Sequence, residues 1–96
     1  MRPAYSSITE HATFRLDAPQ AQGVQVIACL IKDDAKPVIR TLHKGLDGVW
    51  ILRVELARGR YVYRFLVDNS PMLDPSARYN VTDDQGGEWN MREIGY

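Results

Sequence analysis

Alternating apolar and polar positions predict β-strands along most of the chain. Residues 12–16 alternate strictly, residues 24–31 are apolar on both faces for most of their length, and a shorter strand is expected at residues 38–42. A run that is apolar on both faces is typical of a central strand. Because no stretch shows the sustained periodicity of an amphipathic helix, the pattern predicts an all-β protein.

The clearest pattern lies between residues 50 and 67. Two runs with a period of two flank a glycine-containing turn at residues 57–60, and they predict a β-hairpin with an aromatic-rich core face. The residues of that face are Trp50, Leu52, Val54 and Leu56 in the first run and Tyr61, Tyr63, Phe65 and Val67 in the second. The same alternation turns Arg64 and Leu66 outward.

Turn residues divide the rest of the chain. Residues 68–71 and the pair Asp74-Pro75 are turn signals, and a polar stretch leads through Gly86 and Gly87 to a last strand at residues 89–94. Strands spaced about 8 to 12 residues apart favour a sandwich over a closed barrel. We therefore expect one immunoglobulin-like β-sandwich over residues 12–96, preceded by a loosely ordered arm at residues 1–11.

Composition narrows the possible partners and the compartment. The chain has 96 residues, which leaves room for one domain, and its twelve Lys and Arg are balanced by twelve Asp and Glu. A basic footprint is missing, so neither nucleic acid nor a membrane surface is expected as a partner. The longest apolar run is too short to span a bilayer, no signal peptide is apparent, and the single Cys29 excludes an internal disulfide. These features predict a cytoplasmic protein.

Catalytic and metal-binding motifs are missing from the sequence. Both histidines lie outside any recognisable nucleophile–base arrangement. The aspartates Asp83 and Asp84, with Asp33 or Asp34, do not have the spacing of an EF-hand loop or a zinc site. We therefore expect no catalytic residue, no metal site and no cofactor, and we interpret these aspartates as solvated turn residues.

Landmarks between the hairpin turn and the last strand match a known family pattern. The specific part runs from Gly59 through Tyr61, Tyr63, Phe65 and Asp68 to Asp74-Pro75, and Gly87-Glu88-Trp89-Asn90 follows. This order resembles the glycogen- and starch-binding early-set modules, carbohydrate-binding module family 48. That family includes the isoamylase N-terminal domain and the glycogen-recognition domain of the AMP-activated protein kinase beta subunit. The resemblance implies an early-set, immunoglobulin-like β-sandwich that binds α-glucans.

The resemblance also implies a set of sugar contacts. Arg64 matches the family's basic hairpin residue and Asn90 matches its asparagine in the last strand, so we expect carbohydrate contacts from Arg64, Leu66, Glu88 and Asn90. Trp89 is one residue out of phase with Asn90. Alternation therefore predicts that its ring points to the opposite face.

Both tryptophans on which the family stacks glucose rings are missing from this sequence. The first position holds Asp33 or Asp34, and the second holds Pro71. Large aromatic anchors contribute about 2 kcal/mol or more each, so losing two weakens binding roughly a thousandfold. The predicted site is therefore a degenerate version of the family's.

Three functions follow from these observations. The first is a non-catalytic module that binds an α-glucan or maltooligosaccharide weakly. The second is a protein-interaction or regulatory module, or a homodimer, that uses outward apolar residues such as Ile51, Val62 and Leu66. The third, an enzyme, is least favoured because the catalytic acids of multidomain glycoside hydrolases with such modules belong to a barrel for which 96 residues leave no room.

Overall fold

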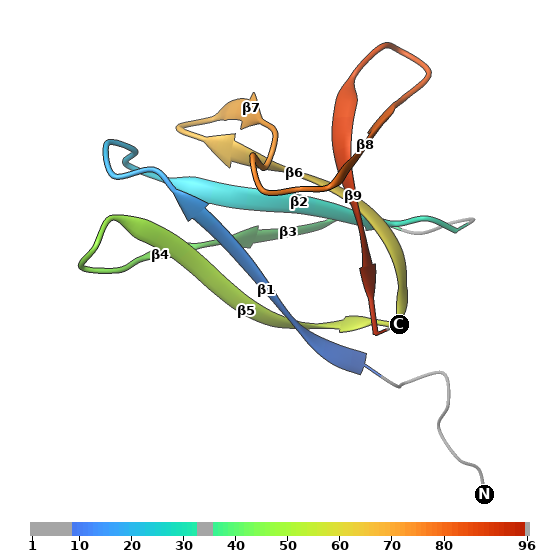
Figure 1. Ribbon diagram of the computed structural model, residues 1–96, viewed down its shortest axis with the longest axis horizontal. Coiled ribbons are helices and arrows are strands. Elements are labelled where there is room, and N and C mark those ends of the chain that lie inside the picture. The colour runs from blue at the N-terminus through green and yellow to red at the C-terminus, as the bar shows by residue number, and fades with distance from the viewer. Residues whose placement is uncertain (1–8, 33–35, 96) are drawn as a thin grey trace, which may run out of the picture.

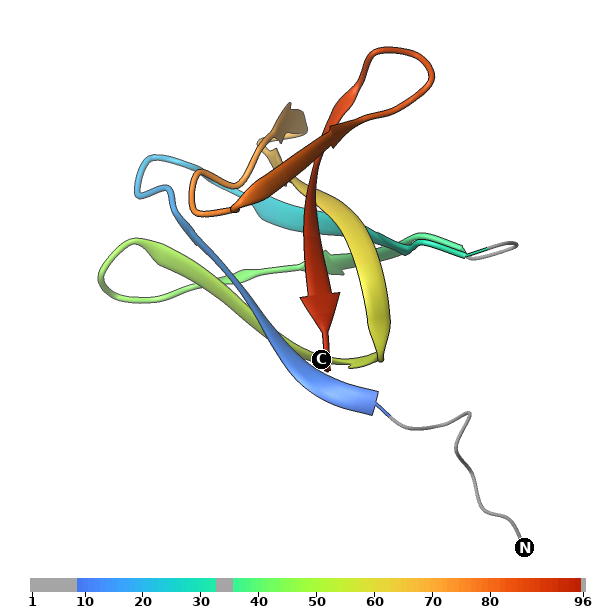
Figure 2. The same ribbon diagram turned by 45° about the vertical axis from the view of Figure 1, so that its right-hand side comes forward.

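The computed structural model describes residues 9–32 and 36–95, which form two antiparallel sheets packed face to face (Figures 1 and 2). The smaller sheet has the order β1-β5-β4, with β1 (Thr9–Asp17), β5 (Val49–Ala57) and β4 (His43–Lys44). The larger sheet has the order β3-β2-β6-β9-β8, with β3 (Val38–Thr41), β2 (Val24–Leu30), β6 (Gly59–Val67), β9 (Glu88–Ile94) and β8 (Tyr79–Thr82). A short strand, β7 (Ser70–Met72), pairs with β6. The predicted all-β, immunoglobulin-like sandwich is confirmed.

The predicted hairpin of residues 50–67 is wrong, although both of its strands exist. β5 pairs with β1 and β4, whereas β6 pairs with β2, β7 and β9, so the chain changes sheets between Ala57 and Gly59. Gly59 has φ of 153°, and a Cβ there would lie 2.4 Å from the Leu30 side chain. Glycine therefore allows β6 to begin in close contact with β2 directly after the crossing.

The inward faces of β5 and β6 meet in the core as the alternation predicts. Phe14 of β1 contacts Tyr63 edge to face with ring centroids 5.2 Å apart, and Tyr63 contacts Phe65 in the same way at 6.1 Å. All three side chains are buried. Because aromatic rings bury large apolar areas, this contact between the sheets stabilises the sandwich strongly.

The predicted arm at residues 1–11 is described only in part, because residues 1–8 lie outside the described residues. The prediction is wrong for Thr9, Glu10 and His11, which belong to β1 and pair with Ala57, Leu56 and Glu55 of β5. Backbone hydrogen bonds to β5 extend this strand beyond the alternating run, since the ladder does not require an apolar side chain at every second position.

The sequence pattern did not predict the short polar strands. β4, β7 and β8 have two to four residues each, and most of their side chains are exposed. A pattern of buried and exposed positions cannot develop in so few residues, so only pairing with a longer neighbour defines them. Within the part of the chain that the structure describes, no helix is long and apolar enough to cross a membrane.

Candidate functional site

The outward side of the larger sheet carries most of the predicted contact residues. Tyr63 and Phe65 point into the core, so Arg64 and Leu66 between and beyond them point outward, as predicted. Neighbouring strands add further outward side chains to this surface, which we call the outer face. Its central residues are Ile27, Val62, Arg64, Leu66, Trp89 and Met91.

Arg64 and Trp89 form a stacked pair on the outer face. The guanidinium carbon of Arg64 lies 3.9 Å from the centroid of the Trp89 ring, and its Nη1 donates to the carbonyl oxygen of Glu88 at 3.3 Å. The Nε atom of Arg64 is buried and has no hydrogen-bond partner among the described residues. A cation over an indole ring is attracted by the negative face of the ring. The arrangement makes neighbours of Arg64 and Glu88, two of the residues from which we expect carbohydrate contacts.

The loop between β8 and β9 fixes the orientation of the Trp89 ring through the carboxylate of Asp83. Asp83 Oδ2 accepts a hydrogen bond from Trp89 Nε1 at 3.0 Å, while its Oδ1 accepts from the backbone N–H groups of Gln85 and Gly87. The hydrogen bond from Trp89, with those from the Gly87 and Gln85 backbone, holds the pKa of Asp83 below its ordinary value. Asp83 is therefore an acceptor that positions an aromatic ring.

Asn90 contradicts its predicted role as a sugar contact. Its side chain is fully buried, where its Oδ1 accepts from the Asp74 backbone N–H at 2.7 Å and its Nδ2 donates to Asn80 Oδ1 at 2.8 Å. Asn90 lies opposite Tyr63 in the β6–β9 ladder, and opposed residues point to the same face, here the core. Asn90 thus joins three segments inside the fold instead of reaching the surface with Arg64.

The same register explains why Trp89 belongs to the site. Since Asn90 points inward with Tyr63, its neighbour Trp89 points outward beside Arg64. The prediction that Trp89 and Asn90 face opposite sides is confirmed, but the sequence placed the wrong one of the two with Arg64. The signal that would have found Trp89 is the pairing register of β6 with β9, which alternation within single strands does not contain.

A small hollow adjoins the stacked pair. It measures about 190 Å³ and is lined by Arg64, Glu88, Pro71 and Met72 of β7, and Leu73 directly after β7. Pro71, which the resemblance aligns with one of the family's stacking tryptophans, pairs with Leu66 of β6. The predicted contacts Arg64 and Glu88 therefore line this hollow, and Leu66 lies opposite its lining residue Pro71. Asp33 and Asp34, which the resemblance aligns with the other tryptophan, lie outside the described residues.

The arrangement suits binding of a neutral polar ligand. It offers a guanidinium donor, a carboxylate acceptor and the apolar surfaces of Leu66 and Pro71, the elements that recognise a sugar hydroxyl and a sugar ring face. Among residues 9–32 and 36–95, no group of three or more His, Cys, Asp or Glu side chains could hold a metal ion.

Comparison with solved structures shows a likeness to a small part of pullulanases. Type I pullulanase from Bacillus subtilis str. 168, complexed with maltose, is 22% identical over 86% of this chain with a TM-score of 0.66. Pullulanase from Anoxybacillus sp. LM18-11, complexed with maltotetraose, is 17% identical over 94% with a TM-score of 0.66. Apo pullulanase from Paenibacillus barengoltzii is 29% identical over 84% with a TM-score of 0.57.

The likeness covers a module of those enzymes and leaves most of each enzyme unmatched. This chain spans 12%, 14% and 13% of the three pullulanases, so their remaining parts have no counterpart in these 96 residues. No protein-family model matches the sequence, and no curated protein matches it. The chain thus shares the all-β fold of a small pullulanase module.

Proposed function

We propose that the chain is a non-catalytic α-glucan-binding module that binds weakly through its outer face. The observation that carries this proposal is the Arg64–Trp89 pair beside the hollow at Pro71, since it supplies an aromatic ring and charged hydrogen-bond groups on one exposed sheet surface. The resemblance to early-set modules supports it. So does the likeness to pullulanases, two of which were solved with maltose or maltotetraose.

The proposed site contacts the sugar through both polar and apolar groups. Arg64 donates to sugar hydroxyls, Glu88 accepts from them, and the side chains of Leu66 and Pro71 pack against the apolar face of a glucose ring. The guanidinium of Arg64 covers one face of Trp89, so the indole holds Arg64 in place and exposes less stacking area than a free ring. Exposed polar contacts exchange water for sugar at small net gain, and we expect dissociation constants of about a millimolar.

A titration of isotope-labelled protein with β-cyclodextrin, followed through the backbone amide shifts, tests this proposal. Saturable shifts should cluster at Arg64, Leu66, Glu88 and Trp89. Arg64→Ala should weaken binding by about tenfold or more, as removal of an interface anchor does. Arg53→Ala is the matched control, because Arg53 is an exposed arginine on β5 of the other sheet. If the backbone amide shifts do not change when β-cyclodextrin is added to about a millimolar, glucan binding is refuted.

A protein-interaction module is the second candidate, and a specific observation favours it. The outer face is largely apolar, and on its β3 side Ile39 is 52% exposed, opposite Ile27. Contiguous apolar surface outside a core marks contact sites. The occupant would be a partner protein or a second copy of this chain.

Sedimentation equilibrium across a wide concentration range separates the two candidates. Association that Ile39→Lys abolishes, without any response to β-cyclodextrin, would favour the interaction module and its homodimer form. A chain that stays monomeric while the glucan shifts appear supports the binding module. Neither proposal assigns a catalytic step to these 96 residues.

A further inference from the structure

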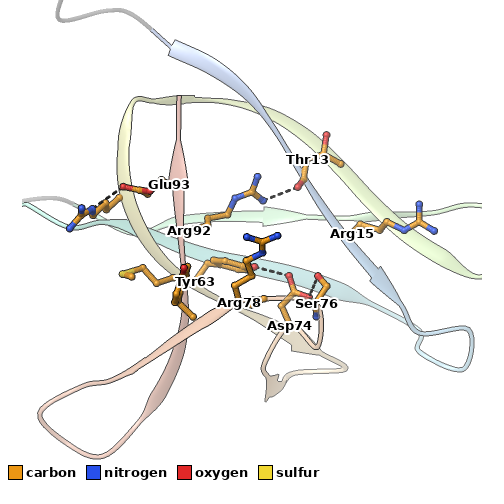
Figure 3. Close-up of a pocket in the computed structure, with 12 residues that line it drawn as sticks. Thr13, Arg15, Tyr63, Asp74, Ser76, Arg78, Arg92 and Glu93 are labelled. Carbon is orange, nitrogen blue, oxygen red and sulfur yellow. Dashed lines mark hydrogen bonds and ion pairs between the residues drawn. The ribbon is translucent and has the colours of Figure 1, made fainter. Parts of the chain in front are cut away.

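Another hollow in the described part of the chain lies away from the outer face. It measures about 670 Å³ and opens at the edge of the sandwich, where β1 of the smaller sheet approaches β9 of the larger one (Figure 3). The segment from Asp74 to Tyr79 forms another of its walls. The proposed glucan contacts Arg64, Leu66 and Glu88 do not line it, so this hollow belongs to a different site.

Arginines from four separate segments line this hollow. They are Arg15 of β1, Arg60 of β6, Arg78 before β8 and Arg92 of β9. Two carboxylates, Asp74 and Glu93, face them, which leaves an excess of two positive charges. On a chain whose formal net charge is zero, this excess is a local concentration. Focused positive potential in a concave site attracts anions.

Both carboxylates already have hydrogen-bond partners. Glu93 Oε2 accepts from Arg60 Nε at 3.0 Å, which pairs one arginine with one acid. Asp74 Oδ2 accepts from the Tyr63 hydroxyl at 2.6 Å, and its Oδ1 accepts from the backbone N–H and the hydroxyl of Ser76. The partners of Asp74 are neutral donors, which occupy its acceptor sites without changing its charge, so the excess on the walls stays at two positive charges.

The structure holds one arginine firmly and leaves a second one without a partner. Arg92 is half-buried, its Nη1 donates to the carbonyl oxygen of Thr13 at 2.9 Å, and its guanidinium carbon lies 4.9 Å from the Phe14 ring centroid. Arg78 makes no hydrogen bond or ion pair within residues 9–32 and 36–95. In Figure 3 its side chain points into the hollow that Arg92 also lines, with Arg15 at the rim.

We propose that this hollow binds a phosphate group, with Arg78 and Arg92 as the principal donors and Arg15 at the rim. A guanidinium presents parallel N–H donors that match the oxygens of phosphate, and a phosphate monoester carries close to two negative charges at neutral pH. That charge equals the excess on the walls. The phosphate comes either from free inorganic phosphate or from a phosphorylated sugar, two sources with the same recognition chemistry.

Titration of the labelled protein at constant ionic strength tests this site with two probes, inorganic phosphate and glucose 6-phosphate. Saturable shifts are expected at Arg78, Arg92 and residues 13–15, with no change at Arg64 or Trp89. A response to both probes assigns a phosphate monoester site, and a response to inorganic phosphate alone assigns a free-phosphate site. Glucose and β-cyclodextrin are the uncharged controls, so failure of this proposal and of glucan binding are distinguishable.

Variants make the test specific for the hollow. Arg78→Gln removes an exposed side chain without a partner, so it should fold normally and weaken phosphate binding about five- to tenfold. Arg53→Gln, which removes an exposed arginine outside the hollow, should bind as the parent does. Unsaturable shifts, or equal binding by the two variants, would show non-specific ion association and overturn the proposal.

Discussion

Replacement of Asn90 by alanine separates a structural role from a binding role. The change removes the acceptor of the Asp74 backbone N–H and the donor to Asn80, in a side chain that is fully buried. The Asp74 N–H then has no partner, and the segment that carries Asp74-Pro75 loses its connection to β9. We expect Asn90→Ala to destabilise the fold and to leave the outer face intact.

The magnitude follows from the groups left behind. An unsatisfied buried donor costs about 1–3 kcal/mol, and loss of the second hydrogen bond adds roughly 0.5–1.5 kcal/mol. The expected loss is therefore about 2–4 kcal/mol. A domain of this length has a total stability of roughly 5–14 kcal/mol, so the variant should lose a large fraction of it. The thermal midpoint should fall by about 10 °C or more.

Urea unfolding followed by tryptophan fluorescence measures this loss as a shift of the midpoint at constant slope. Asn80→Ala is the matched control. It leaves the buried Asn90 Nδ2 without its acceptor but keeps the hydrogen bond from the Asp74 N–H, so we expect a loss of about 1–3 kcal/mol that is smaller than the loss in Asn90→Ala. A stability unchanged within about 0.5 kcal/mol in Asn90→Ala, together with weaker β-cyclodextrin binding, would refute the structural role and restore Asn90 as a surface contact.

Two titrating side chains give further predictions. The pKa of Asp83 lies below its ordinary value because Trp89 and backbone N–H groups donate to the carboxylate, so the stability it contributes is present above about pH 4 and is lost as pH falls through the lowered pKa. Asp83→Asn should therefore be less stable than the parent at pH 7, and the difference should shrink as pH falls below about 4. A difference that stays constant as pH falls would contradict the assignment. Burial, with the hydrogen bond to Asp74, raises the pKa of Tyr63 well above its ordinary value, so the fold favours the neutral phenol and loses stability as pH rises above about 10. Tyr63→Phe keeps the ring in the core and removes the hydrogen bond to Asp74, so it should lower the free energy of unfolding by about 1–2 kcal/mol at pH 7. In urea unfolding at high pH, the variant should lose less stability than the parent. Equal losses of stability at high pH in the two proteins would argue against Tyr63 as the titrating group.

Local pattern was sufficient for the fold class and for most of the core. The alternation in residues 50–56 and 61–67 identified the buried side chains Trp50, Tyr63 and Phe65, because side-chain direction along a strand depends only on the backbone period. The apolar run at residues 24–31 identified β2 as a central strand, which lies between β3 and β6, although its outward face is only half-buried. Turn residues gave the approximate strand limits for the same local reason.

The binding surface needed information that single strands do not carry. Arg64 was placed outward correctly, but which residue of β9 lies beside it depends on the register between two strands far apart in sequence. A shift of one residue exchanges Trp89 and Asn90 between surface and core. The resemblance named Asn90, and only the paired structure showed that Trp89 is the neighbour of Arg64.

The sequence by itself determined that this chain is a small β-sandwich with an aromatic core and no net charge. The tertiary structure alone decided that β5 and β6 belong to different sheets and that four arginines share one hollow. The physical reason is the distance along the chain over which each interaction acts. Alternation, turns and propensities act over a few neighbouring residues, whereas sheet membership, register and charge clustering arise from contacts between segments that only the folded core brings together.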